Sequence, residues 1–266
     1  MIGFIGAGNM AGAIINGCLE NSVLSPFQIS AFDKNRCKSE RFGTITVYNN
    51  IAELVTNEDI IFLSVKPQNF EEVLKEVKDA LSENDFNNKT FITIAAGISV
   101  DFIKERTNIN ANIIRVMPNT LMLVKKGICA IYFPESINTD VKNLVLKIFN
   151  CLGEVREYDE SYMNSIISLT SSSPAYLFLL ADAMAKSAAS EGFDINDSVY
   201  LAACVFEGAA KMLKESQLSP EELIKMVASP GGTTLAALQV FYDNGFVETV
   251  DKAMKACTNR AEELSK

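Results

Sequence analysis

Short apolar runs alternate with amphipathic segments over the first 157 residues. The apolar and β-branched runs predict strands, and apolar residues three or four positions apart between them predict helices. The predicted strands are Ile2–Ile5, Gln28–Phe32, Thr44–Val47, Asp59–Ser64, Thr90–Ile94, Asn112–Val116, Ile128–Phe133 and Glu154–Glu157. The predicted helices between them are Asn9–Glu20, Asn69–Leu81, Val100–Thr107 and Asp140–Cys151. This alternation indicates parallel βαβ units, and therefore a sheet covered by helices on both faces.

The β pattern stops after Asp159, and the rest of the chain is alanine-rich and helical. The predicted helices there are Glu160–Glu191, Ile195–Glu215, Pro220–Val227, Thr234–Tyr242 and Phe246–Leu264. Pro174 interrupts the first of these, so the chain there is either kinked or begins a new helix with proline in its first turn. The change of period predicts an α/β domain over residues 1–157 and an all-α domain over residues 158–266.

Two helical stretches of the second domain are apolar on nearly every face. They are Ala175–Ala189, where only Asp182 and Lys186 are charged, and Leu201–Ala210. A helix that is hydrophobic all round must be covered all round, and about 100 residues in five helices are too few to cover both. We therefore expect a homodimer formed through this domain.

Composition excludes several classes of function. The net charge is −9 and the basic residues are scattered, so no basic stripe could follow a nucleic acid. The first strand begins at once after Met1 and no apolar run is long enough to cross a membrane, which predicts a cytoplasmic protein without a signal peptide. The six cysteines are far apart and predict reduced thiols, with no metal site. Because the chain has no histidine, any catalysis must use hydroxyl, lysine or carboxylate groups, or a cofactor.

A dinucleotide-binding turn is predicted at the start of the chain. Residues 2–13 read as a strand, a G-x-G-x-x-A turn and the start of a helix. Gly6 permits the tight turn, Gly8 lets the backbone approach a pyrophosphate, and Ala11 allows close packing of helix on strand. The predicted coenzyme-binding residues of this turn are Gly6, Ala7, Gly8, Asn9 and Met10.

The residues after the second predicted strand leave the choice of coenzyme open. Asp33 could accept hydrogen bonds from the ribose hydroxyls of NAD and would repel a 2′-phosphate. Lys34, Asn35 and Arg36 follow immediately and could hold that phosphate. A solvated turn of mixed charge is the alternative interpretation. We favour NADPH, with NADH as the other candidate.

Three further loops carry candidate chemistry. Val65-Lys66-Pro67 and Ala95-Ala96-Gly97 leave the carboxyl ends of predicted strands, where an open α/β sheet binds its ligand, although both could be plain turns. In the helical half, Ser229-Pro-Gly-Gly-Thr-Thr precedes an apolar helix. Its glycines permit positive φ, and the positive end of the helix favours an anion, although a capped turn between two helices is the alternative.

With these residues in view, the whole chain resembles the Δ1-pyrroline-5-carboxylate reductases, the last enzymes of proline synthesis. The motifs that carry the resemblance are Gly3-Phe-Ile-Gly-Ala-Gly-Asn-Met, Val65-Lys-Pro, Ala95-Ala-Gly, Arg115-Val-Met-Pro-Asn-Thr, Ser172-Ser-Pro-Ala-Tyr, Gly208-Ala-Ala-Lys-Met-Leu and Ser229-Pro-Gly-Gly-Thr-Thr. The last is the most specific, because a helical bundle does not need it in order to fold.

The resemblance implies a Rossmann-type dinucleotide-binding domain followed by an all-α dimerisation domain, with dimers that often form larger rings. It implies reduction of the cyclic imine Δ1-pyrroline-5-carboxylate to L-proline by NAD(P)H. By the same resemblance Thr234 contacts the ring nitrogen as the catalytic hydroxyl. The residues implied to hold the substrate are Ser229, Gly231, Gly232, Thr233 and Thr234.

The chain departs from the family pattern at three places and has two rival interpretations. Thr170-Ser171 replaces the usual Ser-Gly, Leu121-Met122 lacks a usual proline, and Asp33 leaves the choice of coenzyme open.

The first rival is the β-hydroxyacid dehydrogenase family, whose sequences begin with a similar glycine-rich turn. The only lysine in Glu160–Glu191 is Lys186, and it lacks that family's glycine-rich signature. A dimer that binds the nucleotide without turnover is the other rival, and Thr234 argues against it.

Overall fold

The structure, a computed structural model, describes residues 1–107 and 111–265. The chain folds into two compact units. The first, the sheet unit, holds Met1–Ser172 together with the C-terminal residues from Ala256, and the second, the helical unit, holds Ser173–Lys255. The sequence places the boundary earlier, after Glu157. The two divisions differ because the connecting residues 158–172 and the end of the last helix pack on the sheet unit.

The sheet unit is built on one sheet that has eight strands within the described residues, in the order β3-β2-β1-β4-β5-β6-β7-β8. The strands are β1 (Ile2–Ile5), β2 (Ile29–Phe32), β3 (Thr46–Val47), β4 (Ile60–Leu63), β5 (Thr90–Thr93), β6 (Asn112–Met117), β7 (Gly127–Tyr132) and β8 (Gly153–Glu157). All eight predicted strands are present, with bounds that shift by up to two residues. The parallel pairing expected from βαβ units fails at one place, since β6 pairs with β7 antiparallel. The chain returns there through the short turn η3 (Thr120–Val124) instead of a crossover helix.

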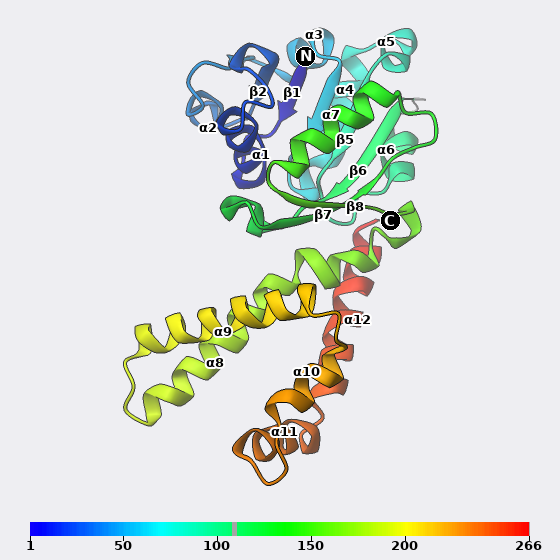
Figure 1. Cartoon of the computed structure of the whole chain (residues 1–266). Helices are drawn as coiled ribbons and strands as arrows, with labels where there is room; N and C mark the ends of the chain where they lie inside the picture. Colours follow the sequence, from blue (N-terminus) through cyan, green and yellow to red (C-terminus); the bar gives the residue numbers. More distant parts are fainter. Residues whose placement is uncertain (108–110, 266) are drawn as a thin grey trace. The chain divides into compact units, whose positions relative to one another are not determined.

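Helices cover both faces of this sheet (Figure 1). One face packs against α1 (Asn9–Glu20) and α7 (Thr139–Asn150), and the other against α3 (Ile51–Asn57), α4 (Phe70–Ala80) and α6 (Val100–Thr107). The shorter helices are α2 (Arg36–Glu40) and α5 (Glu83–Asn87), with 3-10 turns η1 (Pro26–Gln28) and η2 (Pro67–Asn69). The central strands β1 and β4 are buried along their whole length, as expected for parallel strands between two helical layers.

The predicted helix Glu160–Glu191 is not continuous. The chain forms the 3-10 turn η4 (Glu160–Tyr162), a π-helical turn η5 (Ile167–Ser171) and then α8 (Ser173–Ser190). Pro174 is the second residue of α8, where its missing N–H leaves no hydrogen bond unmade. The interruption therefore begins a new helix and is not a kink within one helix.

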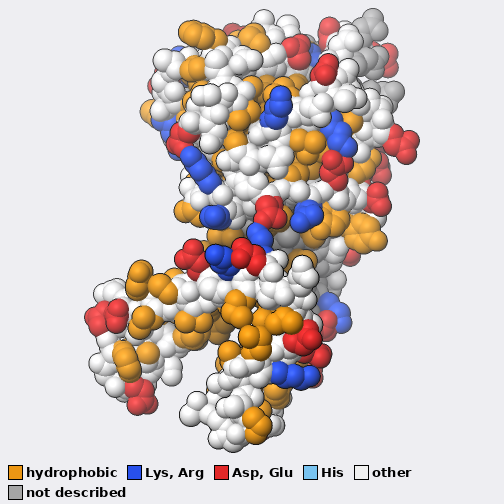
Figure 2. Space-filling model, in the orientation of Figure 1, with side chains coloured by type: hydrophobic (Ala, Val, Ile, Leu, Met, Phe, Trp, Pro, Cys, Tyr) orange, Lys and Arg blue, Asp and Glu red, His pale blue; other side chains and the backbone are white. Residues whose placement is uncertain are grey.

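The helical unit contains α8, α9 (Ile195–Glu215), α10 (Pro220–Val227), α11 (Thr233–Asp243) and the first half of α12 (Phe246–Leu264). α8 and α9 pack together as a helical hairpin. They still leave large apolar side chains in solvent: Phe178 is 63% exposed, Leu179 69% and Tyr200 67%. Figure 2 shows apolar side chains spread over the surface of this hairpin. Such a surface requires a partner to cover it.

Candidate active site

The glycine-rich turn between β1 and α1 lies at the carboxyl edge of the sheet. Gly6 has φ +93°, and its N–H donates to the carbonyl of Phe32 over 2.7 Å. A Cβ on Gly6 would lie 2.8 Å from the carbonyl oxygen of Ser64, so only glycine fits between these two loops. A Cβ on Gly8 would meet nothing within 4 Å. The space in front of Gly8, at the start of α1, is therefore open to a ligand.

A cleft of about 430 Å³ opens beside this turn. It brings together six of the residues predicted to bind the coenzyme, namely Gly6, Gly8, Lys34, Asn35, Val65 and Lys66. Eight other predicted coenzyme residues are outside its lining as the structure describes it: Ala7, Asn9, Met10, Arg36, Pro67, Ala95, Ala96 and Gly97. Arg36 is turned elsewhere, since its guanidinium contacts Glu40 and Asn49, each over 2.6 Å.

Asp33 holds the turn in place. Its Oδ2 accepts the N–H of Ala7 and its Oδ1 accepts the N–H of Asn35, both over 2.9 Å. Lys38 Nζ lies 3.9 Å from Oδ1 and lines the same cleft, although the sequence pattern did not single it out. No local sequence signal marked it, because α2 has only five residues and is too short to show a helical period. Lys34 Nζ donates to Glu72 over 2.7 Å, and this hydrogen bond raises the pKa of Lys34. Lys38 therefore places positive charge beside the Asp33 carboxylate, whereas the ammonium group of Lys34 is paired with Glu72.

This cleft fits a phosphorylated dinucleotide. The open space at Gly8 and the helix start can receive a diphosphate, and Lys34, Asn35 and Lys38 can face an additional phosphate at the end of β2. Asp33 would oppose that phosphate, but its two oxygens already accept backbone N–H groups.

The loop Ser229–Thr234 joins α10 to α11 in the helical unit. Gly231 has φ +73°, and the N–H of Gly232 donates to the Ser229 carbonyl over 3.0 Å. A Cβ on Gly232 would lie 2.7 Å from Ser229 Oγ. α11 begins at Thr233, one residue earlier than predicted, with Gly232 as its N-cap and no side chain capping it. The first N–H groups of this helix therefore have no intrahelical partner, and Thr234 lies half-buried beside them.

Comparisons with known proteins identify the family. The chain is 35% identical to the pyrroline-5-carboxylate reductase of Escherichia coli K12, over 100% of this chain and 98% of that protein. It belongs to the pyrroline-5-carboxylate reductase family.

Solved structures and family models agree. The pyrroline carboxylate reductase of Plasmodium falciparum with NADP bound superposes with a TM-score of 0.90 at 25% identity, covering 100% of this chain and 98% of that one. The pyrroline-5-carboxylate reductase of Coxiella burnetii gives 0.86 at 32% identity, with the same coverage. Residues 160–264 match the family described as pyrroline-5-carboxylate reductase dimerisation, and residues 1–97 the one described as NADP oxidoreductase, coenzyme F420-dependent. The fold prediction of a Rossmann-type domain followed by a helical dimerisation domain is confirmed.

The reductase-family motif Arg115–Thr120 anchors the connection between the two units to the sheet. Arg115 is 2% exposed, and its Nη2 donates to Asn164 Oδ1 over 2.5 Å. Its Nη1 lies 3.6 Å from Glu160, whose Oε1 also accepts the N–H of Val100 over 2.7 Å. Burial lowers the pKa of Arg115, and the Glu160 carboxylate opposes this shift. Within the described residues, Nε of Arg115 has no hydrogen-bond partner.

Two further contacts hold the same connection. Asn119 Nδ2 donates to the carbonyl of Thr170, and Ser171 Oγ donates to the carbonyl of Pro118, both over 3.0 Å. The Thr170-Ser171 departure from the family pattern therefore adds a hydroxyl contact that glycine could not make.

The loop Ala95-Ala96-Gly97 meets the end of the chain. Gly97 has φ +77°, and a Cβ there would lie 2.5 Å from the Cβ of Leu264 and 3.1 Å from the carbonyl of Ala261. The C-terminal end of α12 therefore packs directly on this loop. Asn164 Nδ2 donates to Ser265 Oγ over 3.1 Å, which ties the same end of α12 to the Arg115 network. No local feature of the sequence indicates this contact, because about 165 residues separate its two sides.

Residues 1–107 and 111–265 contain neither a membrane-spanning helix nor a cluster of metal-binding side chains. Within these residues no helix has both the length and the apolar character needed to cross a membrane. The same residues contain no cluster of three or more cysteine, aspartate or glutamate side chains suited to hold a metal ion.

Proposed function

We propose that this chain catalyses the reduction of Δ1-pyrroline-5-carboxylate to L-proline, with NADPH as the hydride donor. The observation that carries the proposal is the full-length similarity to reductases of this name at 35% identity. The open glycine-rich turn of the sheet unit and the Ser229–Thr234 loop of the helical unit supply the two kinds of binding group that this reaction needs.

The coenzyme is held by the carboxyl edge of the sheet. The N–H groups at the start of α1 receive its diphosphate, and Lys34 and Asn35, together with Lys38, face the 2′-phosphate. The loops Val65–Pro67 and Ala95–Gly97 lie against the nicotinamide and its ribose. The preference for NADPH over NADH is supported by the positive charge of Lys34 and Lys38 in the lining of this cleft.

The substrate carboxylate is held by the Ser229–Gly232 turn and the N–H groups at the start of α11. Gly231 at φ +73° and the uncapped helix start supply backbone donors, and the positive end of the helix favours an anion. Ser229 Oγ and Thr233 add hydroxyl groups at the two ends of this turn. Thr234 lies one residue into the helix and directs its hydroxyl to the ring nitrogen.

The chemistry makes few demands on side chains, which agrees with the absence of histidine from the sequence. A cyclic imine protonated on nitrogen is already an electrophile, and bound NADPH supplies hydride to its carbon. The chain contributes orientation, exclusion of water and the Thr234 hydroxyl at the nitrogen. An ordinary threonine is a poor acid, so Thr234 positions the imine and passes a proton from water without ionising.

The active form is a homodimer through the helical unit, supported by the family match over residues 160–264 and by the exposed apolar surface of α8 and α9. A larger ring of dimers and a cytoplasmic location are parts of the same proposal. In functional terms, residues 1–157 bind the coenzyme, and residues 158–266 bind the substrate and the second subunit.

The test is an assay of NADPH and NADH oxidation with pyrroline-5-carboxylate, made on the unsubstituted chain, Thr234→Ala and Thr249→Ala. Thr249 is a matched control, because among residues 1–107 and 111–265 its hydroxyl bonds to the carbonyl of Gly245 in its own helix and to no other group. We expect kcat/KM to fall at least about tenfold in Thr234→Ala, with NADPH binding retained and Thr249→Ala unchanged. Unchanged turnover in Thr234→Ala would remove Thr234 from the mechanism. NADPH binding without turnover in the unsubstituted chain would favour a nucleotide-sensing dimer.

A further inference from the structure

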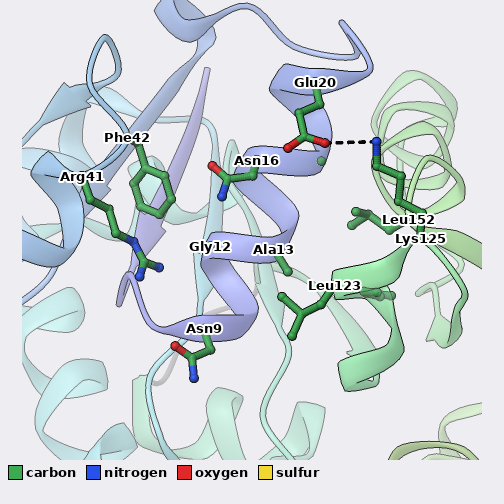
Figure 3. A pocket seen from close by; sticks show the side chains of 12 residues that line it. Asn9, Gly12, Ala13, Asn16, Glu20, Arg41, Phe42, Leu123, Lys125 and Leu152 are labelled. Carbon is green, nitrogen blue, oxygen red and sulfur yellow. Dashed lines mark ion pairs between the residues drawn. The ribbon is translucent and has the colours of Figure 1, made fainter. Parts of the chain in front are cut away.

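Arg41 contacts the dinucleotide turn from outside the coenzyme cleft. It follows α2, and its Nη2 lies 3.2 Å from the carbonyl oxygen of Ala7 and 3.1 Å from that of Gly8. Its guanidinium carbon lies 4.7 Å from the centre of the Phe42 ring. In Figure 3 the two side chains lie side by side, and the guanidinium points toward the start of α1 near Asn9.

The side chain belongs to a second cavity, of about 480 Å³, on the flank of α1. Asn9 and Gly12 line this cavity with Arg41, whereas Gly6 and Gly8 line the coenzyme cleft. Arg41 therefore reaches the glycine-rich turn without lining the cleft in which the coenzyme is expected.

Holding a carbonyl fixes the N–H of the next residue. In a trans peptide the C=O and N–H bonds point in opposite directions across one rigid plane. The carbonyls of Ala7 and Gly8 face Arg41, and that of Gly8 also accepts the N–H of Gly12 over 2.8 Å, so the N–H groups of Gly8 and Asn9 point away from the guanidinium. These are donors at the start of α1 that an anion can use. Asp33 holds the N–H of Ala7 on the other side of the turn.

We propose that Arg41 is a positioning residue for the coenzyme, which orients the N–H groups of Gly8 and Asn9 toward the diphosphate by binding the carbonyls of Ala7 and Gly8. The proposal rests on the proposed function, since it assumes that a dinucleotide binds at this turn. It predicts an effect common to NADPH and NADH, because both carry the diphosphate.

Gly12 provides an independent way to move Arg41. A Cβ on Gly12 would lie 2.3 Å from Arg41 Nη2, a separation that Cβ atoms essentially never show. The atom in the way is the end of a flexible side chain, so a methyl group at Gly12 displaces the guanidinium and leaves the helix backbone in place. Alanine also favours the helix more than glycine does. Gly12→Ala should therefore weaken coenzyme binding without destabilising the fold.

The experiment measures the Kd of NADPH and of NADH by fluorescence titration of the full-length protein without substrate, together with thermal unfolding. The variants are Arg41→Ala, Arg41→Lys, Gly12→Ala, the double variant of Gly12→Ala with Arg41→Ala, and the control Lys125→Ala. Lys125 lines the same cavity but pairs with Glu20 over 3.0 Å (Figure 3). Both Kd values should rise about tenfold in Arg41→Ala and by the same factor for the two coenzymes. Arg41→Lys should recover part of this loss, and Lys125→Ala should match the unsubstituted protein.

Three results depend specifically on positioning through the carbonyl contacts. Gly12→Ala should raise both Kd values while its unfolding temperature stays equal or rises, and the double variant should bind no more weakly than Arg41→Ala. At saturating NADPH the kcat of Arg41→Ala should stay within about twofold of the unsubstituted enzyme. The substitution weakens coenzyme binding, so it raises the KM for NADPH and leaves the chemical step unchanged.

Each other outcome overturns the proposal. Loss of NADPH binding alone would make Arg41 a direct ligand of the 2′-phosphate. A lower unfolding temperature with unchanged Kd values would make its role structural, and an equal loss in Lys125→Ala would assign the effect to the general charge of the cavity. If the unsubstituted protein binds neither coenzyme, the proposed function fails instead, which the first titration reveals.

Discussion

Gly97→Ala tests the contact between the C-terminal end of α12 and the Ala95–Gly97 loop. Gly97 is buried at φ +77°, and the new Cβ would lie 2.5 Å from Leu264 Cβ and 3.1 Å from the Ala261 carbonyl. Both neighbours belong to helix backbone or lie next to it, so neither can move aside by rotating a side chain. Gly43→Ala is a matched control, since Gly43 has φ +73° but open space around its Cβ position.

The expected magnitudes follow from these two geometries. A left-handed backbone costs an alanine about 1–2 kcal/mol, and the loss of glycine's freedom in the unfolded chain offsets about 0.5 kcal/mol of this. The strain common to both variants is therefore about 1 kcal/mol. Overpacking against Leu264 and Ala261 adds about 2 kcal/mol to Gly97→Ala alone. The free energy of unfolding should fall by about 3 kcal/mol in Gly97→Ala and about 1 kcal/mol in Gly43→Ala.

The assay is urea unfolding followed by circular dichroism, because the chain has no tryptophan to report on unfolding. Protein concentration is held constant, since a dimer's stability depends on it. The same samples are assayed for reductase turnover, where displacement of the Ala95–Gly97 loop should lower kcat/KM roughly tenfold in Gly97→Ala and leave Gly43→Ala unaffected. Equal destabilisation by the two substitutions would show that α12 does not press on Gly97, and would refute the reasoning.

Two other predictions follow from buried groups. Glu160→Gln removes the carboxylate that stabilises the buried Arg115 guanidinium, and should lower the free energy of unfolding by about 2 kcal/mol. The loss is smaller than for a fully buried ion pair because the Glu160 side chain is 28% exposed. Denaturant unfolding measures this loss, and an unchanged midpoint would contradict the prediction. Burial raises the pKa of the Cys18 thiol above its ordinary value of 9.0, so this thiol ionises first in the unfolded chain and its contribution to stability is lost as pH rises above 9. The free energy of unfolding should therefore fall more steeply between pH 9 and 10 in the unsubstituted protein than in Cys18→Ala, by about 1 kcal/mol over that interval, and parallel pH profiles would contradict this assignment.

The local pattern of apolar residues was sufficient to predict the strands and the longer helices. The bounds of β1, α1, α6, α9, α10 and α12 agree residue for residue with those predicted, because apolar spacing along one helix or strand reports which face is buried. The short helices α2, α3 and α5 were missed. With five to seven residues each, they are too short to show a period, and α3 is stabilised by packing of Ile51, Leu54 and Val55 into the core.

The sequence by itself determined the two-part organisation, the glycine-rich turn at Gly6–Gly8 and the Ser229–Thr234 loop. Each of these depends on residues adjacent in the chain, whose backbone freedom and charge are properties of the residue types. Only the tertiary structure decided that Lys38 lines the cleft, that Arg41 binds the carbonyls of the turn, and that α12 packs on Gly97. These contacts join segments about 30 to 170 residues apart. A hydrogen bond or a close packing contact depends on where folding brings two atoms, and one-dimensional periodicity carries no record of that distance.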